Sequence, residues 1–165
     1  MGKLHYLKSI QHLPASIETC WEYFSDPRNL LSITPPSLNL VLTSQIFGHS
    51  VYPGQVMTYK VKPFPAISFE WMTEITHIEA PYRFVDEQRK GPYKLWHHQH
   101  HFKQIDGGVE MTDLVHYRLP LGFLGNIAHP FLVKSKLKEI FLYRYQKIEE
   151  RFGAWQGKEF HLEIK

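Results

Sequence analysis

The chain has 165 residues, of which 43% are hydrophobic and 21% charged, as in ordinary folded domains. This length suits one domain, which buries roughly 70% of its unfolded surface. The formal net charge of +3 comes without a concentrated basic stripe, so we expect no nucleic-acid partner.

The sequence has no features of secretion or of membrane insertion. Its one cysteine, Cys20, excludes an internal disulfide and fits a reducing compartment, and we interpret it as a buried, inert thiol. No stretch approaches the roughly 20 apolar residues of a membrane span, and the N-terminus lacks the apolar run of a signal peptide. We expect a cytoplasmic protein without an integral membrane segment.

The first elements are a strand and two short helices. Residues 3–11 alternate between apolar and polar, which predicts the strand. Pro14 suits the first turn of a helix in which apolar residues such as Trp21 recur at helical spacing. Asp26 and Pro27 then predict the cap and first residue of a second short helix, which ends before Pro35.

From Leu38 the period changes to two, and proline- and glycine-rich turns divide the chain into a meander. The predicted strands cover residues 38–47, 55–62, 67–78, 82–89, 93–105 and 109–119. Together with the first strand they predict a seven-stranded, curved antiparallel sheet.

A long helix over residues 130–152 follows the glycine-rich apolar loop 119–125. At 1.5 Å per residue it measures ~35 Å, and it is the only predicted element long enough to cover the apolar face of the sheet. The fold class is therefore α+β, with a cavity expected between sheet and helix. The tail, 154–165, has aromatic residues without a clear period and suits an extra edge strand, packing on the sheet, or contact with a second subunit.

Four histidines in five residues lie within the predicted strand 93–105. Because side chains on a strand alternate between faces, Trp96, His98, His100 and Phe102 share one face. This mixture of large aromatics and imidazoles suits the wall of a pocket. The other face, which carries the remaining two histidines, is expected to be solvent-facing.

The predicted hairpin turn at 106–108 fixes which residues lie opposite this strand. In either possible register Asp113 and Tyr117 share the face of the two inward histidines, and Asp113 lies opposite His100 or Phe102. On the preceding strand the same alternation groups Asp86 with Phe84 and Gln88, and the large aromatic places this set inward.

Several local motifs resemble the SRPBCC superfamily, which has the helix-grip fold of START lipid-transfer domains, birch-pollen-type allergens and polyketide cyclases. The matching segments are Trp21–Leu30, Ile33–Pro36, Phe84–Gln88 leading to Gly91-Pro92, the Trp96-x-His-x-His-x-Phe102 strand and Met111–Pro120. Within it the chain is most similar to small bacterial ligand-binding proteins. The resemblance implies one START-like ligand-binding domain over residues 1–153, followed by the tail, and a hydrophobic ligand cavity. It implies no particular reaction.

We expect the cavity wall to combine aromatic residues with a small polar group. The candidate ligand-binding residues are Trp71, Phe84, Asp86, Gln88, Trp96, His98, His100, Phe102, Asp113, Tyr117, Phe123, Phe141 and Arg144. The loop carrying Phe123 suits either a gate or a packed connection. Arg144 lies on the apolar side of the last helix, where it pairs with the carboxylates or with an anionic ligand.

The polar residues admit three interpretations. They form a mutually satisfied structural network, or they orient a ligand, or, with Asp113 as third ligand to His98 and His100, they hold a metal. The last is disfavoured because no cysteine or Glu-x-x-His motif supports it, so we predict no metal and no cofactor.

The function predicted from the sequence is binding of a small hydrophobic or amphipathic molecule (a lipid, polyketide or aromatic compound) as a carrier or sensor. One alternative is a cyclase or dehydratase in which His100 works as acid or base with Asp113 or Asp86. Another is a regulatory module that responds to its ligand. The protein is expected to be a monomer or a homodimer.

Overall fold

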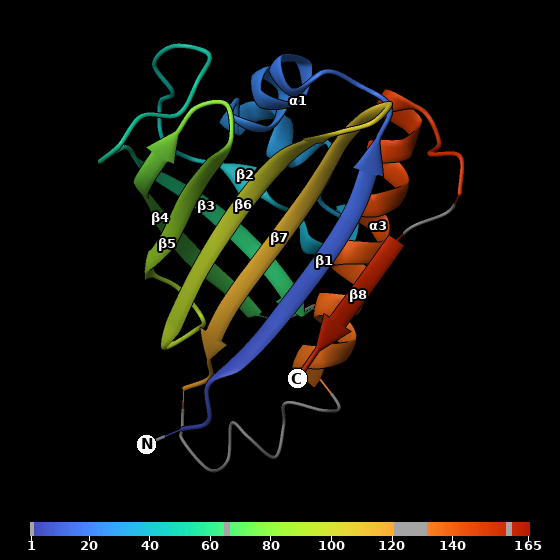
Figure 1. Cartoon of the computed structure of the whole chain (residues 1–165). Helices are drawn as coiled ribbons and strands as arrows, with labels where there is room; N and C mark the ends of the chain where they lie inside the picture. The colour runs from blue at the N-terminus through green and yellow to red at the C-terminus, as the bar shows by residue number, and fades with distance from the viewer. Residues whose placement is uncertain (1, 65–66, 121–131, 158–159) are drawn as a thin grey trace.

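An antiparallel sheet curves around a long C-terminal helix, with a short helix closing one end (Figure 1). The structure is a computed structural model that describes residues 2–64, 67–120, 132–157 and 160–165. Within these residues the sheet has eight strands in the order β2-β3-β4-β5-β6-β7-β1-β8. The α+β class predicted from the sequence is confirmed.

The helices and strands of the described residues are given in chain order. They are β1 (His5–Leu13), α1 (Ile17–Phe24), the 3₁₀ turns η1 (Pro27–Leu31) and η2 (Pro36–Leu38), β2 (Val41–Leu42), β3 (Val56–Phe64), β4 (Ile67–Glu79), β5 (Arg83–Lys90), β6 (Leu95–Ile105), β7 (Gly108–Arg118), α3 (Lys134–Phe152) and β8 (Phe160–Ile164). The five meander strands from β3 to β7 lie within a few residues of their predicted bounds. The predicted start of the last helix, at 130, lies outside the described residues.

Two predicted elements near the start of the sheet are shorter or tighter than expected. The second helix is the 3₁₀ turn η1, whose cap Asp26 accepts a hydrogen bond from the Arg28 N–H at 3.0 Å. The strand predicted over 38–47 is reduced to the two residues of β2. Just before it, Asn39 takes a left-handed conformation (φ 43°) that ends η2 and interrupts the extended backbone.

The C-terminal tail supplies the eighth strand. β8 pairs with β1 from Leu7 opposite Ile164 to Gln11 opposite Phe160, beside α3. Of the three placements considered for the tail, the edge strand is the one observed. The sheet therefore has one strand more than the seven predicted.

The β6–β7 hairpin fixes the register at the centre of the sheet. Its turn contains Gly107, whose φ of 79° is a conformation that glycine adopts without steric cost. Gly108 needs to be small for another reason, because a Cβ there would lie 2.0 Å from the Leu13 carbonyl oxygen. The resulting register places His100 directly opposite Asp113, one of the two predicted alternatives.

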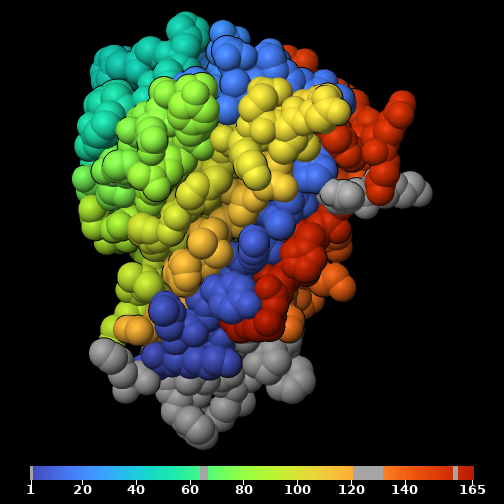
Figure 2. Space-filling model, viewed as in Figure 1, coloured from blue at the N-terminus to red at the C-terminus, as the bar shows by residue number. Residues whose placement is uncertain are grey.

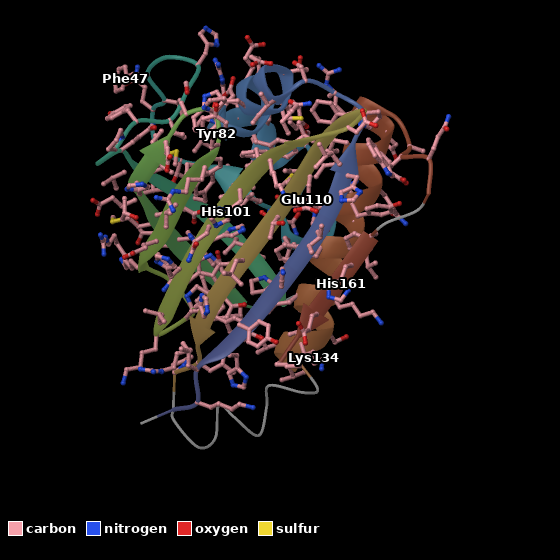
Figure 3. All side chains as sticks on the ribbon, viewed as in Figure 1. Phe47, Tyr82, His101, Glu110, Lys134 and His161 are labelled. Atoms are coloured by element: carbon pink, nitrogen blue, oxygen red, sulfur yellow. The ribbon has the colours of Figure 1, made fainter. Side chains whose placement is uncertain are left out.

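The two faces of β6 differ as predicted. Trp96, His98, His100 and Phe102 are buried on the side of α3. The opposite side is the convex outer face, on which β5, β6, β7, β1 and β8 lie next to one another (Figure 2). Figure 3 places His101 on this outer face, together with Glu110 of β7.

The core consists of two apolar clusters on the inner side of the sheet. One gathers around Phe102, Ile75 and the helix residue Ile148, and the other around Tyr117 and Phe141. Cys20 lies fully buried in the first cluster, and burial raises the pKa of its thiol to about 11, in agreement with the predicted inert role. In the part of the chain that the structure describes, no helix is long and apolar enough to cross a membrane.

Candidate functional site

A cavity of about 470 Å³ lies between the concave face of the sheet and α3. Members of both apolar clusters line it, and its walls come from η1 and η2, strands β3 to β7, and α3. Its volume falls in the range of pockets that enclose small organic molecules, roughly 300–1,000 Å³. Aromatic and aliphatic side chains form most of the wall, and polar side chains converge at one place.

The polar side chains form what we call the buried polar cluster: Asp86, His98, His100 and Asp113. Adjacent strands position them, because Asp86 is paired with His98 across β5–β6 and Asp113 with His100 across β6–β7. Asp86 and the two histidines line the cavity, whereas Asp113 lies behind the imidazoles and does not reach it.

Each histidine lies between two carboxylates. Nε2 of His98 lies 3.0 Å from Asp113 Oδ1 and its Nδ1 lies 3.5 Å from Asp86 Oδ2. Nε2 of His100 lies 3.0 Å from Asp86 Oδ2 and its Nδ1 lies 2.9 Å from Asp113 Oδ1. The last contact is an ion pair rather than an aligned hydrogen bond, because the Nδ1–H direction does not point at the oxygen.

Both carboxyl groups are held in the ionised form. Burial opposes ionisation of Asp113, but its close contacts with His100 and His98 outweigh it and lower the pKa well below its ordinary value. Burial likewise opposes ionisation of Asp86, and His100, His98 and a hydrogen bond from Thr73 again lower the pKa. A buried carboxylate is therefore available both in front of the histidines and behind them.

The two histidines are shifted in opposite directions. Burial and the neighbouring charge on His100 lower the pKa of His98, in spite of its bond to Asp113. Burial also acts to lower the pKa of His100, but Asp113 and Asp86 outweigh it and raise the pKa. His100 is thus the member of the pair that holds a proton more readily, and His98 stays neutral.

Two further residues complete the polar end of the cavity. Thr73 on β4 donates from its hydroxyl to Asp86 Oδ1 at 3.2 Å, which orients that carboxylate. Arg144 on α3 lines the cavity although only 8% of its surface is exposed. Its guanidinium packs 5.0 Å from the Phe141 ring and approaches Asp113 Oδ2 no closer than 3.9 Å, and its Nε has no hydrogen-bond partner. Arg144 therefore faces the cavity with donors to spare.

Aromatic rings frame the polar cluster. Phe84 stacks on His100 with the ring centroids 4.1 Å apart. On the other side Trp71, Tyr93 and Trp96 pack at centroid distances of 4.7 to 5.8 Å. These rings give the cavity a large apolar surface next to its few polar atoms.

The structure brings together most of the residues predicted to line the cavity. Those that line it are Trp71, Phe84, Asp86, Trp96, His98, His100, Phe141 and Arg144. Phe102 and Tyr117 instead lie within the two apolar clusters, where Tyr117 stacks on His5. Phe123, with its proposed gate, lies outside the described residues.

Gln88 takes a local structural position rather than a place on the cavity wall. Its amide donates to the Tyr93 carbonyl at 2.6 Å and accepts from the Tyr93 N–H at 3.2 Å, so it bridges the β5–β6 turn. The strand pairing is regular from Asp86 opposite Ile75 to Gln88 opposite Thr73, so what the sequence prediction missed is the pair of hydrogen bonds to Tyr93. The Gln88 side chain therefore stabilises the turn and does not line the cavity.

The sequence interpretation missed several lining residues that a simple signal identifies. Thr73 and Ile75 follow Trp71 at a spacing of two on β4, so alternation places all three on the same face. Tyr93 precedes β6 in a turn and carries no periodic signal. Tyr59, on the inner side of β3, contributes a further buried ring.

Similar folds occur among solved structures, at low sequence identity. Ginseng major latex-like protein 151 from Panax ginseng is 14% identical, with a TM-score of 0.66 over 92% of this chain and 99% of that one. Protein CV1439 from Chromobacterium violaceum is 9% identical, with a TM-score of 0.68 over 91% and 98%. Protein Ms6760 from Mycobacterium smegmatis is 19% identical, with a TM-score of 0.62 over 88% and 89%.

These similarities establish the fold. The helix-grip architecture expected from the sequence is therefore confirmed. No family model and no curated protein matches the sequence. What the cavity holds has to be argued from its own residues.

Proposed function

We propose that this protein is a ligand-binding member of the SRPBCC superfamily that takes up one small, mostly apolar organic molecule as a carrier or sensor. The observation that carries the proposal is the cavity of about 470 Å³ with apolar walls and one polar end. Burial of apolar ligand surface supplies affinity, at roughly 25 cal/mol per Å² before the cost of association is subtracted. A few convergent polar groups supply orientation.

The charges at the polar end restrict the ligand's polar group. With both carboxylates ionised, His100 protonated and Arg144 positive, the formal charges of this end cancel. The spare donors of Arg144 need an acceptor oxygen, and Asp86 accepts from a ligand hydroxyl. We therefore propose a neutral molecule with a carbonyl or hydroxyl at one end, such as a polyketide, a sterol-like lipid or a phenol.

A polarity-sensitive fluorophore tests this proposal. N-phenyl-1-naphthylamine, which is uncharged, should bind the wild-type protein with a saturable rise in emission. Ile140→Trp should weaken binding at least tenfold, because Ile140 lines the cavity and the larger ring would fill it. Leu142→Trp is the matched control, since Leu142 is 38% exposed on the same helix and does not line the cavity. Equal affinities for the two variants would refute the proposal.

One observation favours a second candidate, an acid–base enzyme of the cyclase or dehydratase type. His100 and Asp86 both line the cavity, with 3.0 Å between Nε2 and Oδ2. The lowered pKa of Asp86 makes it a weak base, so His100, as imidazolium, is the better candidate, as a general acid that polarises a carbonyl. Turnover that His100→Gln abolishes, with ligand affinity retained, would favour the enzyme over the carrier.

A further inference from the structure

The side of the buried polar cluster that faces the cavity has the donor set of a metal site. Asp86, His98 and His100 each offer one donor atom, and the three atoms lie within 4.8 Å of one another. In the part of the chain that the structure describes, this is the one group of three such residues. We propose that these three side chains bind a divalent transition metal ion, with the remaining coordination positions open to the cavity.

Two of the three donor separations fit a metal ion, and the third, between the two imidazole nitrogens, is at most 4.8 Å. Metal–ligand bonds of about 2.1 Å separate neighbouring donors by about 3.0 Å in an octahedral site and about 3.4 Å in a tetrahedral one. Asp86 Oδ2 lies 3.0 Å from His100 Nε2 and 3.5 Å from His98 Nδ1. An ion could therefore replace the protons that lie between the Asp86 carboxylate and the two imidazoles with only small movements of these side chains.

One of the two opposite ring nitrogens, Nε2 of His98, is already hydrogen-bonded as in a metal-binding histidine, and Nδ1 of His100 lies beside the same carboxylate. Metal-bound imidazoles commonly donate their other N–H to a carboxylate, which fixes the ring and the tautomer. Asp113 Oδ1 lies 3.0 Å from His98 Nε2 and 2.9 Å from His100 Nδ1, and Asp113 does not line the cavity. The third ligand has a partner too, since Thr73 donates to the Asp86 oxygen that the ion would not use.

This arrangement replaces the metal hypothesis considered from the sequence. That hypothesis used Asp113 as the third ligand and was disfavoured because no cysteine or Glu-x-x-His motif supports it. In the structure Asp113 lies behind the histidines and Asp86 lies in front of them. Two imidazoles and one carboxylate on a single face favour Zn²⁺, Fe²⁺ or Co²⁺ over Mg²⁺ and Ca²⁺, which prefer oxygen ligands.

Co²⁺ is the probe that tests the site. Protein treated with a chelator and then dialysed would be titrated with Co²⁺, with bound metal counted by elemental analysis and its visible absorption recorded. We expect one Co²⁺ per chain. Asp86→Asn and His100→Gln should each weaken binding at least 100-fold, and Asp113→Asn should weaken it 10- to 100-fold.

The outward histidines of the same strand provide the control. His97 and His101 lie on the other face of β6, so the double variant His97→Gln/His101→Gln should bind Co²⁺ as the wild type does. Circular dichroism of each variant separates loss of a ligand from loss of the fold. Failure of the wild type to bind Co²⁺ at micromolar concentration, or binding that only the outward pair abolishes, would overturn the proposal. Neither result would affect binding of an organic ligand to the metal-free protein.

Discussion

Replacement of Asp113 by asparagine should destabilise the metal-free protein far more than an equivalent change on the outer face. Asp113 is buried, with 4% of its side chain exposed, and it lies 3.0 Å from His98 and 2.9 Å from His100. Asparagine keeps the shape and one acceptor oxygen but removes the charge. His100 would then be left with Asp86 as its only carboxylate partner.

The expected loss of unfolding free energy follows from the contacts that Asp113 makes with His98 and His100. Loss of one member of a buried ion pair costs about 3–5 kcal/mol, and the retained partner Asp86 reduces this, so we expect about 2–4 kcal/mol for Asp113→Asn. For a chain of this size each kcal/mol lowers Tm by about 2–4 °C. The matched control is Glu87→Gln, because Glu87 also pairs with a histidine, His97 Nδ1 at 2.9 Å, but both side chains are about one-third exposed. An exposed pair contributes at most about 1 kcal/mol.

The assay is urea unfolding at pH 6 with a chelator present, followed by circular dichroism and repeated as a thermal melt. Equal slopes against denaturant would show that the variants differ in stability rather than in unfolded-state compactness. A free-energy loss for Asp113→Asn no larger than that for Glu87→Gln would refute the reasoning, since it would mean that the buried charges do not depend on each other.

Three more predictions concern the buried polar cluster, the packing around Gly108 and the buried thiol of Cys20. The stability gap between wild type and Asp113→Asn should be fully present between about pH 4 and pH 6.5 and should shrink on either side. Folding lowers the pKa of Asp113, so its carboxylate stabilises the native state above its unfolded-state pKa, and this stabilisation is lost as the pH falls. Folding raises the pKa of His100, so its imidazolium stabilises the native state below its unfolded-state pKa, and this stabilisation is lost as the pH rises. A gap that stays constant from pH 3 to pH 9 in urea titrations would contradict this. Gly108→Ala should cost about 1–3 kcal/mol, because its methyl group would meet a backbone carbonyl oxygen at 2.0 Å; an unchanged Tm would show that the turn relaxes freely. The thiol of Cys20 should react with Ellman's reagent at pH 8 only at the rate of unfolding, because it is fully buried and its pKa is raised to about 11; rapid labelling of the native protein would contradict its burial.

The regular part of the fold was accessible from the sequence because strand periodicity and turn residues agree there. The alternation along β6 and the glycine turn after it place the two histidines and Asp113 on one face before any coordinates are known. The same reasoning did not anticipate the hydrogen bonds by which Gln88 bridges to Tyr93 in the turn instead of lining the cavity. It also overestimated the strand at 38–47, because the left-handed Asn39 delays its start to Val41 and the strand ends at Leu42.

The arrangement of the polar cluster was only partly accessible. Alternation indicates which face a residue occupies, but not which of two carboxylates lies nearer the cavity. That depends on the three-dimensional packing, in which Asp86 lines the cavity and Asp113 does not. For the same reason the spare donors of Arg144 become evident only once α3 is packed against the sheet.

The measurement that tests the central claim most directly is native mass spectrometry of the protein equilibrated with the uncharged probe N-phenyl-1-naphthylamine. The cavity predicts one adduct per chain for the wild type and for Leu142→Trp, and loss of that adduct for Ile140→Trp. No adduct on the wild type, or the same adducts on all three proteins, would contradict the claim that this cavity binds small apolar molecules.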